Sequence, residues 1–297
     1  MLPSVPHVVD VTHVRGARAD GPPSLLLEVP HGATATRDFT SVRDALRGEL
    51  PAGLADFFHV NTDVGAPEIA EAIAARFVAD RPTASALVVR ARIPRTFIDV
   101  NRVLDLSAAD YKSGGVTPGL PPYVRDADDV ALLRARYAAY QEVAEQAFAA
   151  VCGAGGLAIM VHTYAPRSVD VEVDADIGPK LRAAYAPEVE PTWPLRPEVD
   201  LIVRTQDGRV LADARLVDAV RARLADMGVT AATSETYPLH PSTTAYARAV
   251  RYAGRTLCLE VRRDLVADPW DPFVEMRMSG ERVARVAGAL ADALREA

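Results

Sequence analysis

Short apolar runs recur along the chain and predict buried β-strands. In residues 24–29 four of the six side chains are aliphatic, and Pro30, His31 and Gly32 follow directly. Residues 157–161 are apolar without alternation, which is typical of a central strand in a parallel sheet. On this basis we predict strands over residues 24–29, 86–89, 96–100, 157–161, 199–203, 229–233 and 256–261.

Between these runs, apolar residues recur at the spacing of an α-helix. Residues 67–79 place Ile69 and Phe77 on one face, and residues 128–151 keep an apolar face behind Asp128, a candidate N-cap. Helices are predicted over residues 67–79, 128–151, 213–227, 242–252 and 279–297, and long loops over residues 105–126 and 165–200.

The alternation of strands and helices predicts an α/β fold, because the connections are long enough for crossovers between parallel strands. We expect a single α/β domain over residues 1–297, with a mixed, mostly parallel sheet flanked by helices on both faces. In such sheets, ligands bind beyond the carboxyl ends of the strands. The polar residues that follow the predicted strands are therefore the first candidates for a functional site.

Composition and charge exclude several classes of protein. Of the 297 residues, 49% are hydrophobic and 25% are charged, which does not fit a disordered, collagen-like or coiled-coil chain. A net charge of −7 gives no general attraction to nucleic acid or to an anionic membrane. No apolar run approaches the roughly 20 residues of a membrane span. The N-terminus lacks the pattern of a signal peptide and only Cys152 and Cys258 are cysteines, so we expect a cytoplasmic protein with buried thiols.

Two of the six histidines, His31 and His162, follow strongly apolar predicted strands. Two imidazoles and one carboxylate with an open position describe a catalytic zinc site. The alternative is that each is a hydrogen-bonded core histidine. Asp63, in a turn that leads into a predicted helix, is either a third ligand or a plain N-cap.

Glu260 and the pair Asn101-Arg102 also lie in or just after predicted strands. A carboxylate in the apolar segment around Glu260 costs desolvation free energy, unless it is paired or used. Glu260 could pair with Arg262, or it could act as a general base with a raised pKa. Asn101 and Arg102 are either a structural cap and an exposed arginine or a receptor for a carboxylate.

Five short motifs, in this order and spacing, resemble the N-formylglutamate amidohydrolase family over roughly residues 24–270. The motifs are Pro30-His31-Gly32, Thr62-Asp63-Val64-Gly65, Asp99-Val100-Asn101-Arg102, His162-Thr163-Tyr164-Ala165-Pro166 and Glu260-Val261-Arg262-Arg263-Asp264. Arg196-Pro197 and Glu235-Thr236-Tyr237-Pro238 also match family positions. That family is similar in fold to zinc carboxypeptidases and aspartoacylases, so the resemblance implies a phosphorylase/hydrolase-like α/β fold.

The resemblance also implies a function and a set of site residues. It implies a metal-dependent amidohydrolase with one Zn²⁺ per chain, acting on C–N bonds other than peptide bonds. The implied metal ligands are His31, His162 and Asp63, with Glu28 as the substitute if Asp63 only caps a helix. Glu260 would activate water, and Arg95 would polarise the scissile carbonyl. The implied substrate-binding residues are Asn101, Arg102, Arg196, Tyr237 and Arg262.

Three functions remain open on the sequence alone. The first is hydrolysis of a small N-acyl amino acid such as N-formylglutamate, in amino acid metabolism. The second is a zinc carboxypeptidase or another N-acyl amino acid deacylase, and the third is a non-catalytic module that binds carboxylates through Arg102 and Arg262. Met160 and Thr163 stand where many relatives have Asp and Ser, which predicts a pocket that differs from theirs. A homo-oligomer is compatible with the sequence.

Overall fold

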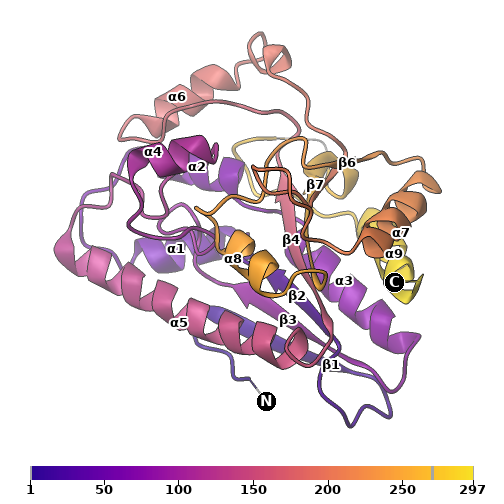
Figure 1. The fold of residues 1–297 in the computed structure, drawn as a ribbon. Coiled ribbons are helices and arrows are strands. Elements are labelled where there is room, and N and C mark those ends of the chain that lie inside the picture. The colour runs from indigo at the N-terminus through magenta and orange to yellow at the C-terminus, as the bar shows by residue number, and fades with distance from the viewer. Residues whose placement is uncertain (1, 269–270, 297) are drawn as a thin grey trace.

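A seven-stranded mixed sheet runs through the molecule in the order β1-β3-β2-β4-β7-β5-β6 (Figure 1). The computed structural model describes residues 2–268 and 271–296. The strands are β1 (Val9–Arg15), β2 (Leu25–Val29), β3 (Ser85–Ala91), β4 (Leu157–Tyr164), β5 (Val199–Ile202), β6 (Ala231–Thr233) and β7 (Thr256–Arg262). The helices are α1 (Thr36–Arg43), α2 (Leu54–Asn61), α3 (Ala66–Ala79), α4 (Ala108–Ser113), α5 (Ala127–Val151), α6 (Ile177–Ala184), α7 (Ala214–Ala225), α8 (Thr244–Arg251) and α9 (Gly280–Glu296), with 3₁₀ turns η1 (Glu190–Thr192) and η2 (Arg263–Leu265).

Four adjacent parallel strands, β3, β2, β4 and β7, form the middle of the sheet. Every residue of β2 is buried, as its mostly aliphatic sequence predicts, and the one polar member is Glu28. At one edge β1 pairs with β3 in the antiparallel direction, and on the other side β5 runs antiparallel to β7. The predicted fold class, a mixed and mostly parallel sheet between helices, is confirmed.

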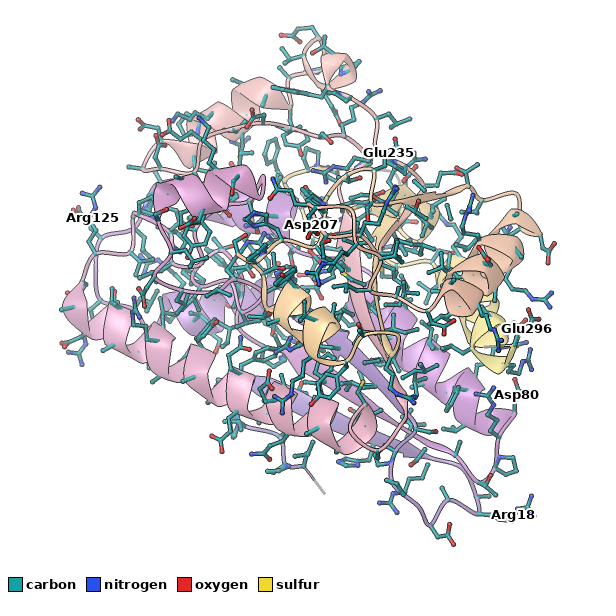
Figure 2. All side chains as sticks on the ribbon, viewed as in Figure 1. Arg18, Asp80, Arg125, Asp207, Glu235 and Glu296 are labelled. Carbon is teal, nitrogen blue, oxygen red and sulfur yellow. The ribbon has the colours of Figure 1, made fainter. Side chains whose placement is uncertain are left out.

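Two apolar cores lie on the two faces of the sheet. Because side chains alternate along a strand, Leu25 and Leu27 of β2 point into one core and Leu26 points into the other. Helices α3, α7 and α9 cover the first face, and α1, α2, α5 and α8 contribute to the second. Exposed charged residues such as Arg18, Asp80 and Arg125 project outward from the periphery (Figure 2).

Four local predictions are wrong. Residues 96–100 do not form a strand, since the amides of Phe97 and Ile98 turn back to the carbonyl of Pro94. Both side chains are nevertheless buried, which explains their apolar pattern. The predicted loops over residues 105–126 and 165–200 contain α4 and α6, respectively. Helix α5 is capped by Asp126 instead of Asp128.

Several short helices and one strand were not predicted from the sequence. Strand β1 and helices α1, α2 and α6 have no more than eight residues each, which gives a periodicity too little length to stand out. Ala297, the predicted end of the last helix, lies outside the described residues. Within the described part of the chain, no helix combines the length and apolarity needed to cross a membrane.

Candidate metal centre and active site

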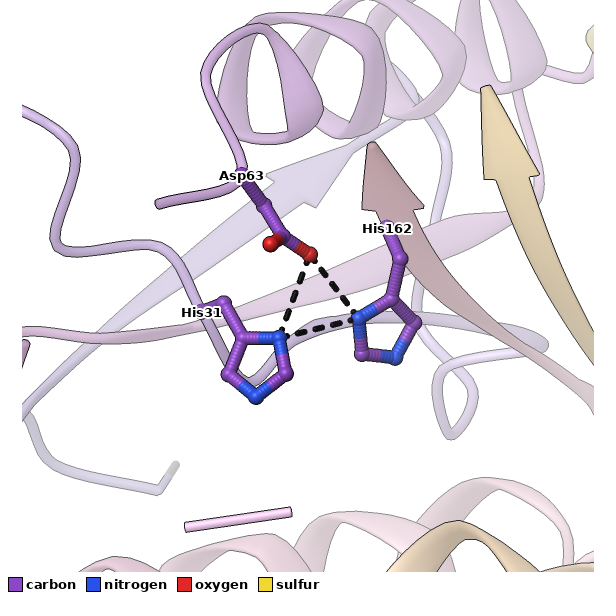
Figure 3. A group of neighbouring side chains, drawn as sticks. All are labelled: His31, Asp63 and His162. Atoms are coloured by element: carbon purple, nitrogen blue, oxygen red, sulfur yellow. Dashed lines mark hydrogen bonds and ion pairs between the residues drawn. The ribbon is translucent and has the colours of Figure 1, made fainter. Parts of the chain in front are cut away.

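The sheet brings His31 and His162 together, although 131 residues separate them. His31 follows β2 by two positions, and His162 lies near the carboxyl end of β4. Because β2 and β4 are parallel neighbours, both side chains lie at the same edge of the sheet. Asp63 reaches this place from the link between α2 and α3 (Figure 3).

These three residues form a buried cluster of candidate ligand atoms, which we call the His-Asp-His cluster. The Nδ1 atoms of His31 and His162 are 3.2 Å apart. Asp63 Oδ2 lies 3.2 Å from His31 Nδ1 and 2.9 Å from His162 Nδ1. Ligands about 2.0–2.1 Å from one tetrahedral zinc ion are about 3.3 Å from each other, so the spacing fits a single ion. The donor set of two imidazole nitrogens and one carboxylate oxygen also suits zinc.

A second carboxylate orients His31. Its Nε2 lies 2.8 Å from Asp99 Oδ1, and we assign the proton to Nε2 from this contact, so that Nδ1 can bind a cation. Burial opposes ionisation of Asp99, but Arg102, His31 and Arg95 outweigh it and hold the pKa of this carboxyl well below its usual range. Asp99 is therefore an anion that binds Nε2 of His31, the ring nitrogen that is not part of the cluster.

The turn that carries Asp63 is held from both sides. Thr62 Oγ1 donates a hydrogen bond to the carbonyl of Ala33 at 2.9 Å, and Thr163 Oγ1 donates to the carbonyl of Val64 at 2.8 Å. The N-cap of α3 is Gly65, at a φ of 94° that favours glycine. Asp63 is thus not the N-cap of that helix, and its carboxylate is directed to the two histidines instead. Burial disfavours its charged form, but His31 and His162 outweigh burial and lower the pKa of Asp63.

Glu260 lies beside the cluster on β7, opposite His162 in the strand register. Its Oε2 atom is buried without a hydrogen-bond partner among the described residues. Burial raises the pKa of Glu260 to about 7, and the Asp63 carboxylate adds to the rise, whereas His162 opposes it. A carboxyl group that ionises near neutral pH, with an unused oxygen, suits a general base.

The cluster and Glu260 line a cavity of about 820 Å³ that also contains several arginines. Arg95 donates a 2.9 Å hydrogen bond to Asp99, and its Nη1 lies 3.4 Å from His31 Nδ1. Arg102 is buried, its Nη1 donates to the carbonyl of Asn101, and its Nε has no partner within the described chain. Asn101 Oδ1 accepts hydrogen bonds from the first turn of α8, which fixes the turn that carries Arg102.

Two of the remaining predicted binding residues lie in the cavity, and one does not. Arg196 donates to the Tyr237 hydroxyl at 3.1 Å, and both residues line the cavity. Arg262 is absent from the described lining, since its guanidinium binds Asp264 at 2.8 Å and the carbonyl of Arg196 at 2.9 Å. The prediction that Arg262 contacts the substrate therefore has no support from its position.

The neighbouring Arg263 lines the cavity in place of Arg262. Strand β7 ends at Arg262, and the η2 turn redirects the next side chain, whose Nη1 donates to the carbonyl of Val60 at 2.7 Å. The family motif around Glu260 contains both arginines, and only Arg262 is among the predicted binding residues. Lys112 and Arg167 also line the cavity, and no motif in the sequence indicated them.

Glu28, the substitute ligand, is engaged elsewhere. It is buried between β2, α5 and α8, where one oxygen accepts hydrogen bonds from Tyr140 and Arg248. Arg248 also donates to Gln141 at 2.9 Å, and Gln141 donates to the carbonyl of Val100 at 2.6 Å. This buried network ends at the turn that carries Asn101 and Arg102.

Comparison with known proteins decides the family. The model of the N-formylglutamate amidohydrolase family matches residues 24–267, most of the chain. The chain belongs to this family. This family consists of hydrolases of the amidohydrolase type. All the motifs that indicated the family lie within the matched region, which ends three residues before the end of the expected range of 24–270.

Two solved structures share the fold at low identity, and a third is similar only at a lower score. An N-formylglutamate amidohydrolase from Ralstonia eutropha JMP134 is 19% identical, with 97% of this chain and 96% of that chain covered and a TM-score of 0.56. The gene product Atu2144 from Agrobacterium tumefaciens is 20% identical, with 97% and 93% covered and a TM-score of 0.53. A metallo-carboxypeptidase from Burkholderia cenocepacia is 10% identical, with 99% and 66% covered and a TM-score of 0.37. No curated protein matches the chain.

Proposed function

We propose that this protein is a zinc-dependent hydrolase of the amide bond of N-acyl amino acids, with N-formylglutamate as the first substrate to test. The observation that carries the proposal is the buried His-Asp-His cluster beside Glu260, in a cavity lined by arginines. The family supplies the reaction class, and the cluster supplies a reason for metal dependence. The substrate partner is a small molecule with a free carboxylate, which suits Arg102.

The cluster fits the implied metal in its donor atoms, spacing and burial. His31, Asp63 and His162 would hold the ion, one Zn²⁺ per chain. Burial and Arg95 lower the pKa of His31, but Asp99 and Asp63 outweigh them and raise it, so a metal ion at Nδ1 competes with a proton and should bind less tightly as the pH falls. When bound, zinc lowers the pKa of a water molecule and polarises a carbonyl group.

The residues of the chain have separate tasks in this proposal. Glu260 accepts the proton of the attacking water and returns it to the nitrogen of the leaving amine. Arg95, beside the cluster, faces the negative charge that develops on the carbonyl oxygen. Arg102 binds the carboxylate of the substrate and so orients the amide towards Glu260.

A metal and activity measurement tests the proposal. Zinc-supplemented protein is expected to hold about one zinc per chain and to release formate from N-formylglutamate, and chelation should abolish the release. His162→Ala should lose both zinc and activity. His13→Ala, on the edge strand β1 and outside the described cavity lining, is the matched control and should keep both. A protein that binds carboxylates but holds no zinc and hydrolyses no N-acyl amino acid would be a non-catalytic binding module.

We also propose the cytoplasm as the place of action. Cys152 and Cys258 are buried and free, and a reducing compartment keeps such thiols unpaired.

A further inference from the structure

The cavity is much larger than the smallest substrate of the proposed reaction requires. N-formylglutamate has roughly a dozen non-hydrogen atoms, which at about 30 Å³ for each water-sized group fill less than about half of such a space. A volume of about 820 Å³ lies in the upper part of the range, about 300–1,000 Å³, that holds drug-sized ligands. More than half of the cavity would therefore remain outside a bound N-formylglutamate molecule and could accept a larger substrate.

Six apolar side chains line one part of the cavity, and we call this group the apolar wall, although the exposed residues Asp170 and Glu172, which alternate with its valines in the sequence, also belong to the lining. The apolar wall comprises Phe57 and Val60 of α2, Val169, Val171 and Val173 of the chain between β4 and α6, and Leu181 of α6. All but Leu181 are only partly buried, and they pack against the core with part of their surface. Water against such a wall costs free energy that an apolar ligand group would recover.

The apolar wall and the carboxylate receptor reach the His-Asp-His cluster from different sides. Val60 precedes Asp63 by three residues at the end of α2. Arg102 instead connects to the cluster through Asp99, which contacts His31. Figure 1 shows α6, which carries the far end of the wall, well apart from α8, whose first turn binds Asn101.

A substrate held by its carboxylate at Arg102 has its amide carbonyl at the cluster, so its acyl group extends away from Arg102. We propose that the apolar wall binds this acyl group, and that the preferred substrates are N-acyl amino acids with a large apolar acyl chain instead of a formyl group. This inference rests on the proposed amide hydrolysis. The bond between the acyl carbon and nitrogen breaks, the water oxygen joins the acyl carbon, and the amine leaves with a proton.

The test is a series of substrates of increasing acyl length. Zinc-supplemented protein is assayed with N-formyl-, N-acetyl-, N-butanoyl- and N-octanoylglutamate. Each added methylene that is fully buried against the wall should raise kcat/KM by about threefold to fourfold, until the wall is filled. A formyl substrate that equals or exceeds the octanoyl substrate would overturn the inference and leave the proposed hydrolysis intact.

Variants of Val171 test whether the preference for a long acyl chain arises at the apolar wall. Val171→Asp should lower kcat/KM for the octanoyl substrate by about tenfold or more and leave the formyl substrate nearly unchanged, because only the longer chain contacts the wall. Val171→Thr keeps the side-chain shape and should cause a smaller loss in the same direction. Val210→Asp is the matched control, at an exposed valine outside the described lining. Equal losses on both substrates would contradict a role of Val171 in acyl binding.

A binding measurement separates the two proposals if no substrate is hydrolysed. Calorimetry should then show N-octanoylglutamate binding more tightly than N-formylglutamate, with the difference lost in Val171→Asp. That result would support the wall and reject the hydrolysis. Equal binding of both compounds, or binding of neither, would reject the wall as well.

Discussion

At the scale of single residues, three carboxyl groups around one cluster differ sharply in their protonation. His31 and His162 lower the pKa of Asp63, and two arginines with His31 lower that of Asp99, so both are anions at neutral pH. The buried Oε2 atom of Glu260 accepts no hydrogen bond from the part of the chain that the structure describes, and burial raises the pKa of this carboxyl group to about 7. The environment thus assigns charge to two carboxylates and leaves the third able to exchange a proton.

Substitution of Glu260 tests this division of roles. Glu260→Gln keeps the size of the side chain but cannot take a proton, so kcat should fall about 10²- to 10⁴-fold with little change in KM. Zinc content is measured in parallel and should stay the same, because Glu260 is outside the His-Asp-His cluster. Full activity of the variant on the best substrate would show that another group is the base.

The pH dependence of kcat/KM follows from the same group. A base must be deprotonated, so activity should fall as pH drops through its pKa, by about tenfold per pH unit on the acid side. Without metal that pKa is about 7, and a nearby cation favours the carboxylate, so the acid limb should lie at or below pH 7. If the acid limb of the pH profile is unchanged in Glu260→Gln, the group that titrates there is a different residue.

Arg102 should affect substrate binding more than the chemical step. Arg102→Ala removes a charge-assisted contact to the substrate carboxylate, so KM should rise strongly, with a smaller loss of kcat from misorientation. Arg102→Lys should recover only part of this loss, since an ammonium group cannot form two parallel hydrogen bonds. Steady-state kinetics of both variants on one substrate make the comparison, and equal KM values for wild type and Arg102→Ala would exclude the assignment.

At the scale of elements, a buried ion pair joins β2, α5 and α8 behind the carboxylate receptor. Arg248→Met would leave Glu28 buried without its cation, and breaking such a pair costs about 3–5 kcal/mol of unfolding free energy. The exposed pair of Arg251 and Glu145 on the same helices is the matched control, and Arg251→Met should cost at most about 1 kcal/mol. Urea unfolding of both variants measures the difference. Equal losses of unfolding free energy would show that the buried pair stabilises the protein no more than the exposed pair does.

The elements also show which parts of the fold could be predicted from the sequence. Long segments such as α5 and fully buried, mostly aliphatic strands such as β2 were predictable, because many residues repeat one signal. Residues 96–100 form a turn and not the predicted strand. Their apolar side chains are buried, and a short apolar run is equally typical of a buried strand. The cluster residues could be predicted from motifs, but Arg263 could not, because the η2 turn after β7 changes which side chain faces the cavity.

At the scale of the whole molecule, the cluster exists only in the folded chain. Its candidate ligands come from the turn after β2, the α2–α3 link and β4, which are far apart in sequence, so the unfolded chain offers no comparable site. Zinc at about 1,000 times its dissociation constant should then add about 4 kcal/mol to the unfolding free energy, and raise Tm by several degrees. Thermal unfolding with zinc and with chelator measures this shift, and His162→Ala should show none.

The chain between β4 and β5 has a consequence for how this family can diversify. It carries Val169, Val171, Val173 and Leu181, but none of the three candidate metal ligands and not Glu260. Insertions or substitutions there would reshape acyl selection while the reacting groups stay on the strands and the short links around them. Under the proposed acyl binding, changes in this segment would therefore alter substrate preference without touching the residues proposed for the reaction itself.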